Sequence, residues 1–367
     1  MRRSRHVLSF CAASAMLAGC GGSQPPIGGP GLTLQGGTAP DLDVNRASAR
    51  TSTKSCPAAA CIYVSNGAAD GSITVYAANA TGNVRPYRTI AGAKTGLTNP
   101  SGVAVDSRGK VYVIKAAGDP VLVFSATAHS DVYPLRSIMT RSQQLSGIAL
   151  DANRNVYASN IKIIGQCRSG CRLKGYVTEY AAGSRGNVPP IRTIRGRKTR
   201  LFNVGGISVD SIGNVYVATT PSCRTSNQCR GKTAILVYGP GAHRDAAPSW
   251  MLSGSQTRLI HPNGVAVDDA GNVYVSDVGS VYGSVYVYAS GQHGNVAPIQ
   301  AISGPKTNLV TPLSVAVDTV HHIYVANSQA AGTVTVYAAG ATGNVAPIQT
   351  IGGPRTGLVI PFGIAVH

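Results

Sequence analysis

Acidic side chains and regular helical patterns are both scarce in this sequence. Asp and Glu together supply 14 of the 367 residues, Glu179 is the single Glu, and charged residues of either sign make up 13%. No segment shows convincing amphipathic helical periodicity, whereas 44 Gly and 21 Pro provide many turns. The length suits one large domain or two ordinary ones. We therefore predict an all-β protein.

The familiar sequence motifs of catalysis are missing as well. The chain contains no HExxH pattern of zinc hydrolases, no GxSxG nucleophile turn and no phosphate-binding loop. The sequence therefore predicts no catalytic residue, no metal and no cofactor.

The N-terminus reads as an export signal. "MRRSRH" is basic, "VLSFCAASAML" is apolar but too short to span a bilayer, and "LAGC" follows. The "LAGC" box resembles the lipobox of bacterial lipoproteins, which implies that residues 1–19 are removed and that Cys20 receives lipid. An ordinary signal peptide with an incidental Cys is the alternative. Residues 20–55 have no strand or helix pattern and are predicted to form a disordered tether. We expect residues 56–367 to fold outside the cytoplasm, held to a bacterial membrane in the cell envelope.

Six cysteines remain once the signal peptide and Cys20 are set aside. They form three close pairs: Cys56 and Cys61, Cys167 and Cys171, Cys223 and Cys229. Export favours disulfides, and the spacings differ from the Cys-x2-Cys of zinc sites. We predict local disulfides, although the sequence leaves their connectivity and a metal site open.

A short phrase recurs along the chain. Gly-Val/Ile-Ala/Ser-Val/Leu-Asp, or a close variant, begins at Gly102, Gly147, Gly206, Gly264, Ser314 and Gly363. Each of the first five copies is followed by a turn and a "VYV"-like strand. A sixth such strand, "CIYVSN" at 61–66, has no phrase before it, and the last phrase, 363–367, has no such strand after it. The spacing is 45–59 residues and contains four predicted strands, which is typical of propeller blades.

We therefore predict a six-bladed β-propeller with four strands in each blade. The strand at 363–367 would pair beside 61–66, complete the first blade and remove the open edge of a linear stack. Strands that are apolar on both faces fit this architecture, because each blade is covered by two others. Val265 and Val267 on one face of a strand, with Ala266 on the other, illustrate the pattern.

The pattern P-x-G-V-A-V-D-x-x-G-N-V-Y-V resembles the NHL-repeat class of six-bladed propellers over residues 61–367. The match is good in the first two strands of each blade and weaker in the third, and the second blade departs most. The resemblance implies that the first strand lines a central channel. NHL-like propellers include enzymes, sensor domains and binding scaffolds, so the fold does not assign a function.

An Asp ends the first strand in five blades: Asp106, Asp151, Asp210, Asp268 and Asp318. Each stands just before a short turn, as in "VDDAGNVYV", where its carboxylate can accept hydrogen bonds from the turn backbone. We interpret these residues as structural and not catalytic.

By analogy with such propellers, ligands are expected on the face made by the connections between second and third strands and between successive blades. We call this the top face. Its predicted channel-mouth residues are Asn99, Asn203, His261 and Asp277. His261 and Asp277 make a metal-dependent lactonase-like or lyase-like enzyme the alternative to a binding module. Hard cations need several oxygen ligands, so the scarcity of carboxylates at the mouth counts against this enzyme.

Positive charge is concentrated in one part of the ring. Residues 147–263 contain 16 basic and 4 acidic residues, whereas residues 264–367 contain 2 basic and 4 acidic residues. Much of this charge falls in predicted top-face loops, at Arg168, Arg172, Lys174, Arg195, Arg197, Lys198, Arg200, Arg224, Arg230 and Lys232. A solvated basic face is the alternative to a binding site.

The charge favours an anionic partner. The export signal argues against nucleic acid, and the few aromatic residues in these loops argue against a single-strand platform. Anionic polysaccharides, envelope polymers and lipid headgroups remain. We therefore expect a binding or scaffold module.

Overall fold

The computed structural model describes residues 60–165, 172–223 and 229–367. The predicted signal peptide, Cys20, the tether and Cys56 lie outside the described residues. In the described ranges, no helix is both long and apolar enough to cross a membrane.

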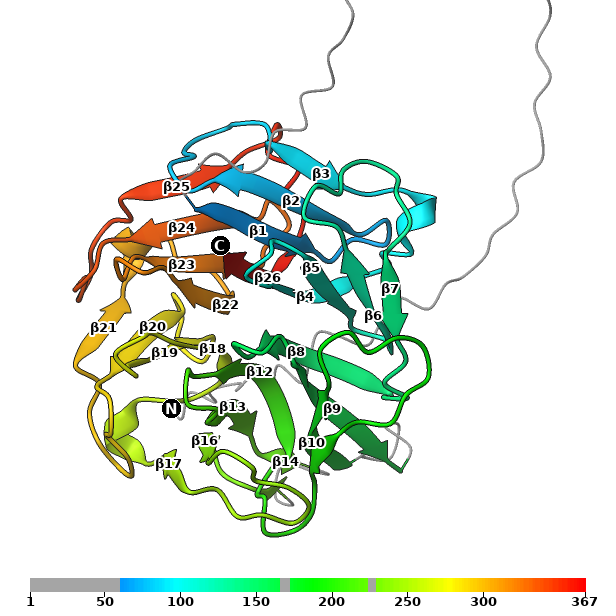
Figure 1. Cartoon of the computed structure of the whole chain (residues 1–367). Coiled ribbons are helices and arrows are strands. Elements are labelled where there is room, and N and C mark those ends of the chain that lie inside the picture. The colour runs from blue at the N-terminus through cyan, green and yellow to red at the C-terminus, as the bar shows by residue number, and fades with distance from the viewer. Residues whose placement is uncertain (1–59, 166–171, 224–228) are drawn as a thin grey trace, which may run out of the picture. The chain divides into compact units, whose positions relative to one another are not determined.

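Six four-stranded antiparallel sheets are arranged as a ring, as predicted (Figure 1). From its innermost strand outward, blade 1 consists of β26 (Pro361–Val366), β1 (Cys61–Asn66), β2 (Ser72–Ala77) and β3 (Arg88–Ile90). In the same order, blade 2 consists of β4 (Pro100–Val105), β5 (Val111–Lys115), β6 (Gly118–Phe124) and β7 (Arg136–Ile138). Blade 3 consists of β8 (Gln144–Leu150), β9 (Val156–Ile164), β10 (Arg172–Tyr180) and β11 (Arg192–Ile194). Blade 4 consists of β12 (Asn203–Val209), β13 (Val215–Thr220), β16 (Ala234–Tyr238) and β17 (Trp250–Leu252). Blade 5 consists of β18 (Pro262–Val267), β19 (Val273–Asp277), β20 (Ser284–Tyr288) and β21 (Gln300–Ser303). Blade 6 consists of β22 (Pro312–Val317), β23 (Ile323–Asn327), β24 (Thr333–Tyr337) and β25 (Gln349–Gly352). A short hairpin, β14 (Ser222–Cys223) with β15 (Cys229–Arg230), is inserted in blade 4.

The first blade is built from both ends of the ring, as the repeat predicted. β26 pairs antiparallel with β1, with Ile62 opposite Val366 and Val64 opposite Ile364. The N–H of Cys61 donates to the carbonyl of His367 at 2.6 Å, and the N–H of His367 donates back at 3.1 Å. The inner edge of β1 is therefore paired, and blade 1 has four strands like the other blades.

The glycine of the recurring phrase lets the innermost strands pack backbone to backbone. A Cβ on Gly147 would lie 2.9 Å from the Cα of Gly206, and one on Gly363 would lie 2.8 Å from the Cα of Gly102. Glycine therefore allows a close approach of successive first strands. Blade 6 has Ser314 at this position, and its Oγ accepts the N–H of Ile364 at 3.3 Å.

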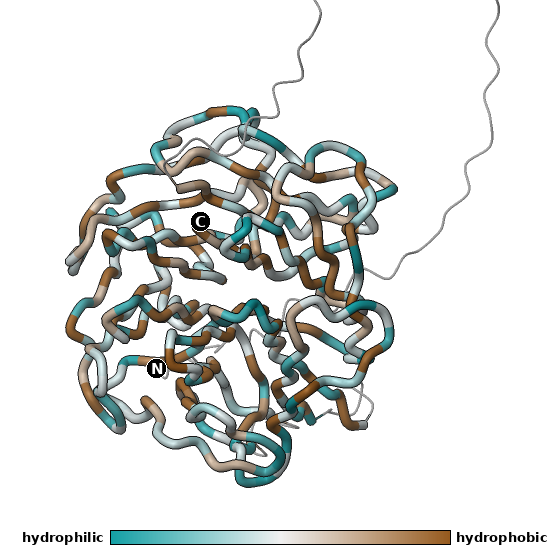
Figure 2. Tube along the Cα trace, in the orientation of Figure 1, coloured by the Kyte–Doolittle hydropathy of each residue, from teal (hydrophilic) through white to brown (hydrophobic). Residues whose placement is uncertain are grey.

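The core lies between blades and not inside them. One cluster combines Tyr63 and Val75 of blade 1 with Val113 and Phe124 of blade 2, and all four side chains are buried. Hydrophobic residues follow the strands of every blade (Figure 2). Both faces of the sheets are thus covered, which explains why the strands are apolar on both faces.

The aspartates at the ends of the first strands are structural, as predicted. In blade 5, Oδ1 of Asp268 accepts the N–H of Asn272 at 2.7 Å, and Oδ2 accepts the hydroxyl of Tyr274 at 3.0 Å. Blade 2 repeats the arrangement with Asp106 and Tyr112. Burial raises the pKa of both tyrosines, and the neighbouring carboxylate adds to the rise.

A second set of tyrosines bonds the connections to the blades that they enter, except in blade 2, where Phe124 stands at the equivalent position. The hydroxyl of Tyr288 donates to the carbonyl of Thr257 at 2.5 Å, and the hydroxyl of Tyr76 donates to that of Thr356 at 2.5 Å. Burial raises the pKa of Tyr76 to about 12. These bonds hold the top-face connections in fixed positions.

Candidate functional site

Two hairpins of neighbouring blades meet on the top face. In blade 3, β9 and β10 continue past the rest of the sheet, to Ile164 and from Arg172. In blade 4, the β14–β15 hairpin stands beside them, and the N–H of Leu173 donates to Oγ of Ser222 at 2.7 Å. A disulfide joins Cys223 to Cys229 across this second hairpin, as predicted. The two predicted basic insertions therefore form one contiguous support.

Arg172 and Lys174 lie in a strand, where the sequence predicted a loop. The hairpin continues because Leu173 pairs with Ile163, and both pack against the core cluster of blades 3 and 4. Arg172 and Lys174 occupy the positions on either side of Leu173 in this strand.

Lys162 was not among the predicted site residues. It lies directly opposite Lys174 in the β9–β10 pairing, and both side chains are exposed. Like charges facing each other across a strand pair are destabilising unless an anion or solvent screens them. The sequence signal for the longer strand was the segment "IKII" at 161–164, in which the charged Lys162 stands between two apolar residues.

The connection that follows β11 (residues 195–202) completes the support. The guanidinium of Arg195 lies 5.8 Å from the centroid of the Tyr176 ring, within the range of a cation–π contact. The N–H of Gly175 donates to the carbonyl of Leu201 at 3.3 Å. The connection is thereby attached to β10 beside the two hairpins.

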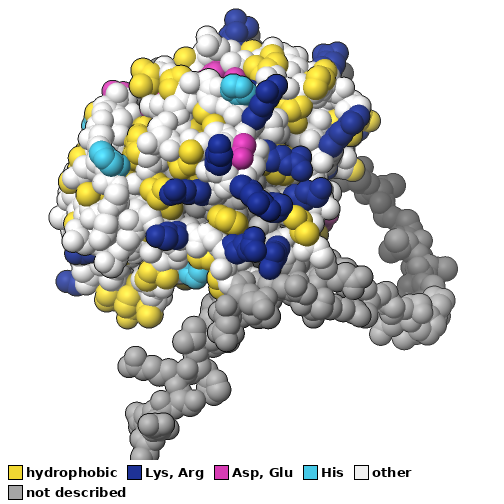
Figure 3. Space-filling model, turned by 90° about the horizontal axis from the view of Figure 1, so that it is seen from below, with side chains coloured by type: hydrophobic (Ala, Val, Ile, Leu, Met, Phe, Trp, Pro, Cys, Tyr) yellow, Lys and Arg dark blue, Asp and Glu magenta, His cyan; other side chains and the backbone are white. Residues whose placement is uncertain are grey.

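We call the cations on these segments the basic surface. Its described members are Lys162, Arg172, Lys174, Arg195, Arg197, Lys198, Arg200, Arg230 and Lys232. Arg168 and Arg224, also predicted, lie outside the described residues, as do Cys167 and Cys171. Seen from the edge where β14–β17 lie in Figure 1, the molecule shows many Lys and Arg and few Asp or Glu side chains (Figure 3).

None of these nine cations forms an ion pair within the described ranges. Nearby carboxylates have other partners: Asp245 accepts the backbone N–H of Lys198 at 2.7 Å, and Glu179 pairs with Arg192 of blade 3. The positive charge of the basic surface is therefore left to solvent or to a ligand.

The predicted channel-mouth pair does meet, but not in a catalytic arrangement. Asp277 is 1% exposed, and its carboxylate accepts the backbone N–H groups of Ile260 at 2.8 Å, His261 at 3.1 Å and Gly279 at 2.7 Å. The imidazole of His261 makes no hydrogen bond to it in the described structure. Asn66 occupies the same position in blade 1, where its side-chain oxygen accepts the N–H of Val359. Asp277 is therefore a structural acceptor.

Asn203 and Asn99 also serve the local fold. The amide of Asn203 donates to Oγ1 of Thr220 at 2.9 Å. Asn99 stands just before β4 with a φ of 46°, and its carbonyl accepts the N–H of Ala116 at 3.1 Å. Neither contact brings a carboxylate to the channel mouth.

One cluster within the described residues has the composition of a metal site. Asp268, Asp269 and His321 have ligand atoms within 4.8 Å of one another, on the face opposite the top face. Asp268 already accepts Asn272 and Tyr274, and Nδ1 of His321 lies 3.3 Å from the same carboxylate. An Asp–His contact between blades 5 and 6 accounts for the cluster.

No family model and no curated protein matches this chain. Among solved structures, a protein of unknown function from Bacteroides caccae aligns with a TM-score of 0.52 and 11% identity, over 84% of this chain and 98% of that one. A protein from Lactobacillus plantarum aligns at 0.47 and 13%, over 84% and 99%. The PQQ-bound aldose sugar dehydrogenase of Streptomyces coelicolor aligns at 0.42 and 17%, over 71% and 82%. The first likeness concerns the fold alone, and the two weaker ones support no conclusion about activity.

Proposed function

We propose that this protein is a lipid-anchored, extracytoplasmic propeller whose basic surface binds an anionic polymer of the cell envelope or its surroundings. The observation that carries this proposal is the gathering of nine cations, none in an ion pair with another described residue, on three segments that are bonded to one another. The proposal includes membership of the NHL-like propellers and lipidation of Cys20, which rest on the sequence resemblance.

The support suits binding because it is already ordered. The Cys223–Cys229 disulfide, the Leu173–Ser222 hydrogen bond and the stacking of Arg195 on Tyr176 restrict the segments that carry the charge. A ligand then meets cations whose backbone is fixed, which lowers the entropy lost on association.

An extended ligand fits this surface better than a small one. Eight of the nine cations are exposed and Arg172 is half-buried, and they are spread over two blades, so a chain with repeated negative groups can contact several of them together. Each Lys or Arg beside an anionic surface contributes about 1 kcal/mol at low ionic strength, and salt screens exposed charges.

Titration against anionic polymers tests the proposal. Full-length protein, purified under oxidising conditions, is titrated with alginate, with a teichoic acid and with phosphatidylglycerol vesicles at low and physiological salt. Replacing Lys162, Lys174 and Arg195 by Ser should weaken binding by about tenfold to a hundredfold.

The control removes the same charge elsewhere. Arg85, Lys306 and Arg355 are exposed and belong to other blades, so their replacement by Ser changes the net charge equally. Binding that survives physiological salt and is lost only in the first variant supports the basic surface. Equal weakening in both variants would mean that the charge acts as a general surface property.

A further inference from the structure

A cavity of about 170 Å³ lies between blades 2 and 3, on the face opposite the basic surface. It is lined by Asp106, Arg108, Lys110, Tyr112, Arg136, Arg154, Ala182 and Gly183. Sites for drug-sized ligands are usually larger, roughly 300–1,000 Å³, so this cavity suits a small group. Half of its lining residues are cationic.

The one carboxylate in the lining does not neutralise these cations. Asp106 is 4% exposed, and its Oδ1 accepts the backbone N–H groups of Arg108 at 3.0 Å and Lys110 at 2.9 Å. Its Oδ2 accepts the hydroxyl of Tyr112 at 3.1 Å. In the described structure, Arg108, Lys110, Arg136 and Arg154 form no ion pair.

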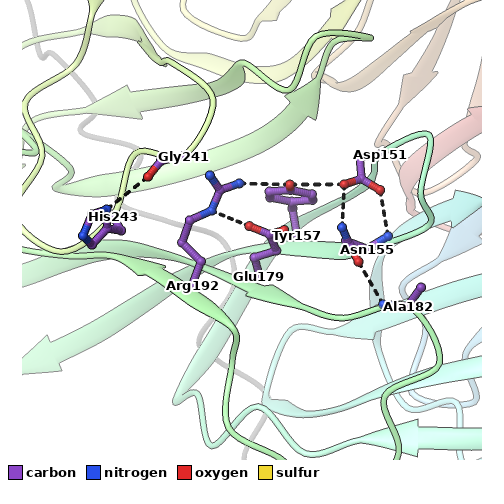
Figure 4. Close-up of polar contacts among 8 residues, drawn as sticks. All are labelled: Asp151, Asn155, Tyr157, Glu179, Ala182, Arg192, Gly241 and His243. Atoms are coloured by element: carbon purple, nitrogen blue, oxygen red, sulfur yellow. Dashed lines mark hydrogen bonds and ion pairs between the residues drawn. The ribbon is translucent and has the colours of Figure 1, made fainter.

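The equivalent arginine of blade 3 shows what Arg136 lacks. Arg192 lies between the hydroxyl of Tyr157 and the carboxylate of Glu179, as Figure 4 shows. Arg136 likewise donates to the hydroxyl of Tyr112, at 3.2 Å, but it has no carboxylate partner, and its buried Nε has no hydrogen-bond acceptor among the described residues.

The repeats show that the fold does not require cations at this cavity. In blades 4 and 5 the turn after the first strand reads "DSIGN" and "DDAGN", with Gly fourth and Asn fifth. The fifth-position Asn closes the turn: the side chains of Asn214 and Asn272 donate to Oδ2 of the Asp at 2.7 and 2.8 Å. Blade 2 has Lys110 in place of that Asn, and blade 3 has Arg154 in place of that Gly.

Lys110 forgoes a side-chain contact that the turns of blades 4 and 5 make, whereas blade 3 keeps Asn155, whose side chain donates to Oδ2 of Asp151 at 2.8 Å. Lys110 supplies only its backbone N–H to Asp106, and Arg154 adopts a φ of 65°, a conformation that favours Gly. Both cations line the same cavity.

We propose that this cavity binds a single phosphate-type oxyanion. Three guanidinium groups and one ammonium offer more donors than the two oxygens of a carboxylate can accept, and guanidinium groups pair bidentately with tetrahedral oxyanions. The ligand is either free inorganic phosphate or the terminal phosphate monoester of a larger molecule. The proposal does not depend on the basic surface, which lies on the other face of the ring.

Calorimetric titration of the full-length protein tests this site. The probes are inorganic phosphate and glycerol 2-phosphate, in chloride buffer at constant ionic strength. The test variant, K110N with R154G, introduces the residues that the turns of blades 4 and 5 have at these positions and should therefore preserve the fold, which thermal denaturation verifies. The control variant, R85S with R355S, removes two exposed cations that belong neither to this cavity nor to the basic surface.

Saturable one-to-one binding is expected, weakened about tenfold or more in K110N/R154G and unchanged in R85S/R355S. Tighter binding of inorganic phosphate would identify the free ion as the ligand, and equal or tighter binding of glycerol 2-phosphate would identify a phosphate monoester. The absence of saturable binding of either probe, or equal affinity in K110N/R154G and the unmodified protein, would overturn the proposal.

Discussion

Buried tyrosine hydroxyls connect the turns and connections to the blades. The hydroxyl of Tyr274 donates to Asp268, and that of Tyr288 donates to the carbonyl of Thr257. Both acceptors are buried, and losing a donor to a buried acceptor is more costly than losing an exposed hydrogen bond.

Replacing Tyr274 by Phe should lower the free energy of unfolding by about 1–3 kcal/mol, because the buried carboxylate of Asp268 loses a donor. Urea denaturation measures the change. The matched control is Tyr133→Phe, since Tyr133 is 73% exposed and should tolerate the loss of its hydroxyl. Equal stability of the Tyr274 variant and the unmodified protein would contradict this account of the turn.

The buried tyrosines that donate to the connections between blades should make the protein unstable in alkali. Burial raises the pKa of Tyr76 and Tyr337 from 10.0 to about 12. Below pH 10 these hydroxyls are neutral in both states, and their contribution to stability is complete. Between pH 10 and 12 they ionise in the unfolded chain first, so stability falls as pH rises.

A titration of tyrosinate absorbance, followed together with circular dichroism, checks this prediction. Exposed tyrosines should ionise near pH 10 while the β signal persists, and the buried ones should ionise together with unfolding. Ionisation of all 16 tyrosines near pH 10 in an intact fold would contradict it.

At the scale of elements, the two hairpins on the top face differ in how they are stabilised. β9–β10 is continuous with its blade and is supported by the core contacts of Ile163 and Leu173. β14–β15 has two residues in each strand and is closed by the Cys223–Cys229 disulfide. So short a hairpin has little other support, since an isolated two-stranded hairpin is marginal in water.

Replacing Cys223 and Cys229 by Ser should therefore lower the affinity for the anionic polymer while leaving the thermal stability of the protein nearly unchanged. We expect affinity for the anionic polymer to fall about three- to tenfold, because Arg230 and Lys232 must then be ordered on binding. The melting temperature should change little, since both cysteines are exposed and outside the core. Polymer titration and thermal denaturation of the same sample measure the two effects. Unchanged affinity would show that the disulfide does not prepare the basic surface.

At the scale of the whole molecule, the ring depends on β26. This strand pairs with β1 and also packs between β22 and β4. Deleting residues 361–367 should remove the cooperative unfolding transition, because blade 1 loses its inner strand and the edge of β1 is exposed. Circular dichroism during thermal denaturation measures this loss.

A circular permutant tests whether the ring needs β26 itself or needs the chain ends at their present position. Joining residue 367 to residue 61 through a short linker, and opening the chain between β2 and β3, keeps every strand and every pairing. This permutant should fold and unfold cooperatively. Cooperative unfolding of the truncated chain would show that closure by β26 is dispensable.

Lipidation of Cys20 is a further prediction for the whole chain. Metabolic labelling with an alkyne fatty acid should label the protein in a bacterial host, and the protein should sediment with membranes. Replacing Cys20 by Ser should abolish both labelling and sedimentation. Membrane association of the Ser variant without labelling would contradict a lipid anchor.

Much of the architecture could be predicted from the sequence because the fold is a repeat. The phrase beginning at Gly102 and its copies set the number of blades, and the unpaired copies at 61–66 and 363–367 predicted the closure. The aspartate turns were also predicted correctly, because an Asp followed by Gly and Asn makes its hydrogen bonds locally. These features depend on contacts between residues close in sequence or on one pattern repeated many times.

The site depended on contacts that no local pattern encodes. Lys162 faces Lys174 only because the Ile163–Leu173 pair packs on the core and extends the strand. The bond from Leu173 to Ser222 spans 49 residues, and Asp277 meets His261 through backbone groups that a sequence pattern does not show. The cavity of Lys110 and Arg154 likewise forms between two blades. The sequence by itself determined the blades, their order and the charge of blades 3 and 4, whereas packing between blades decided which cations stand together, since that packing joins residues far apart in the chain.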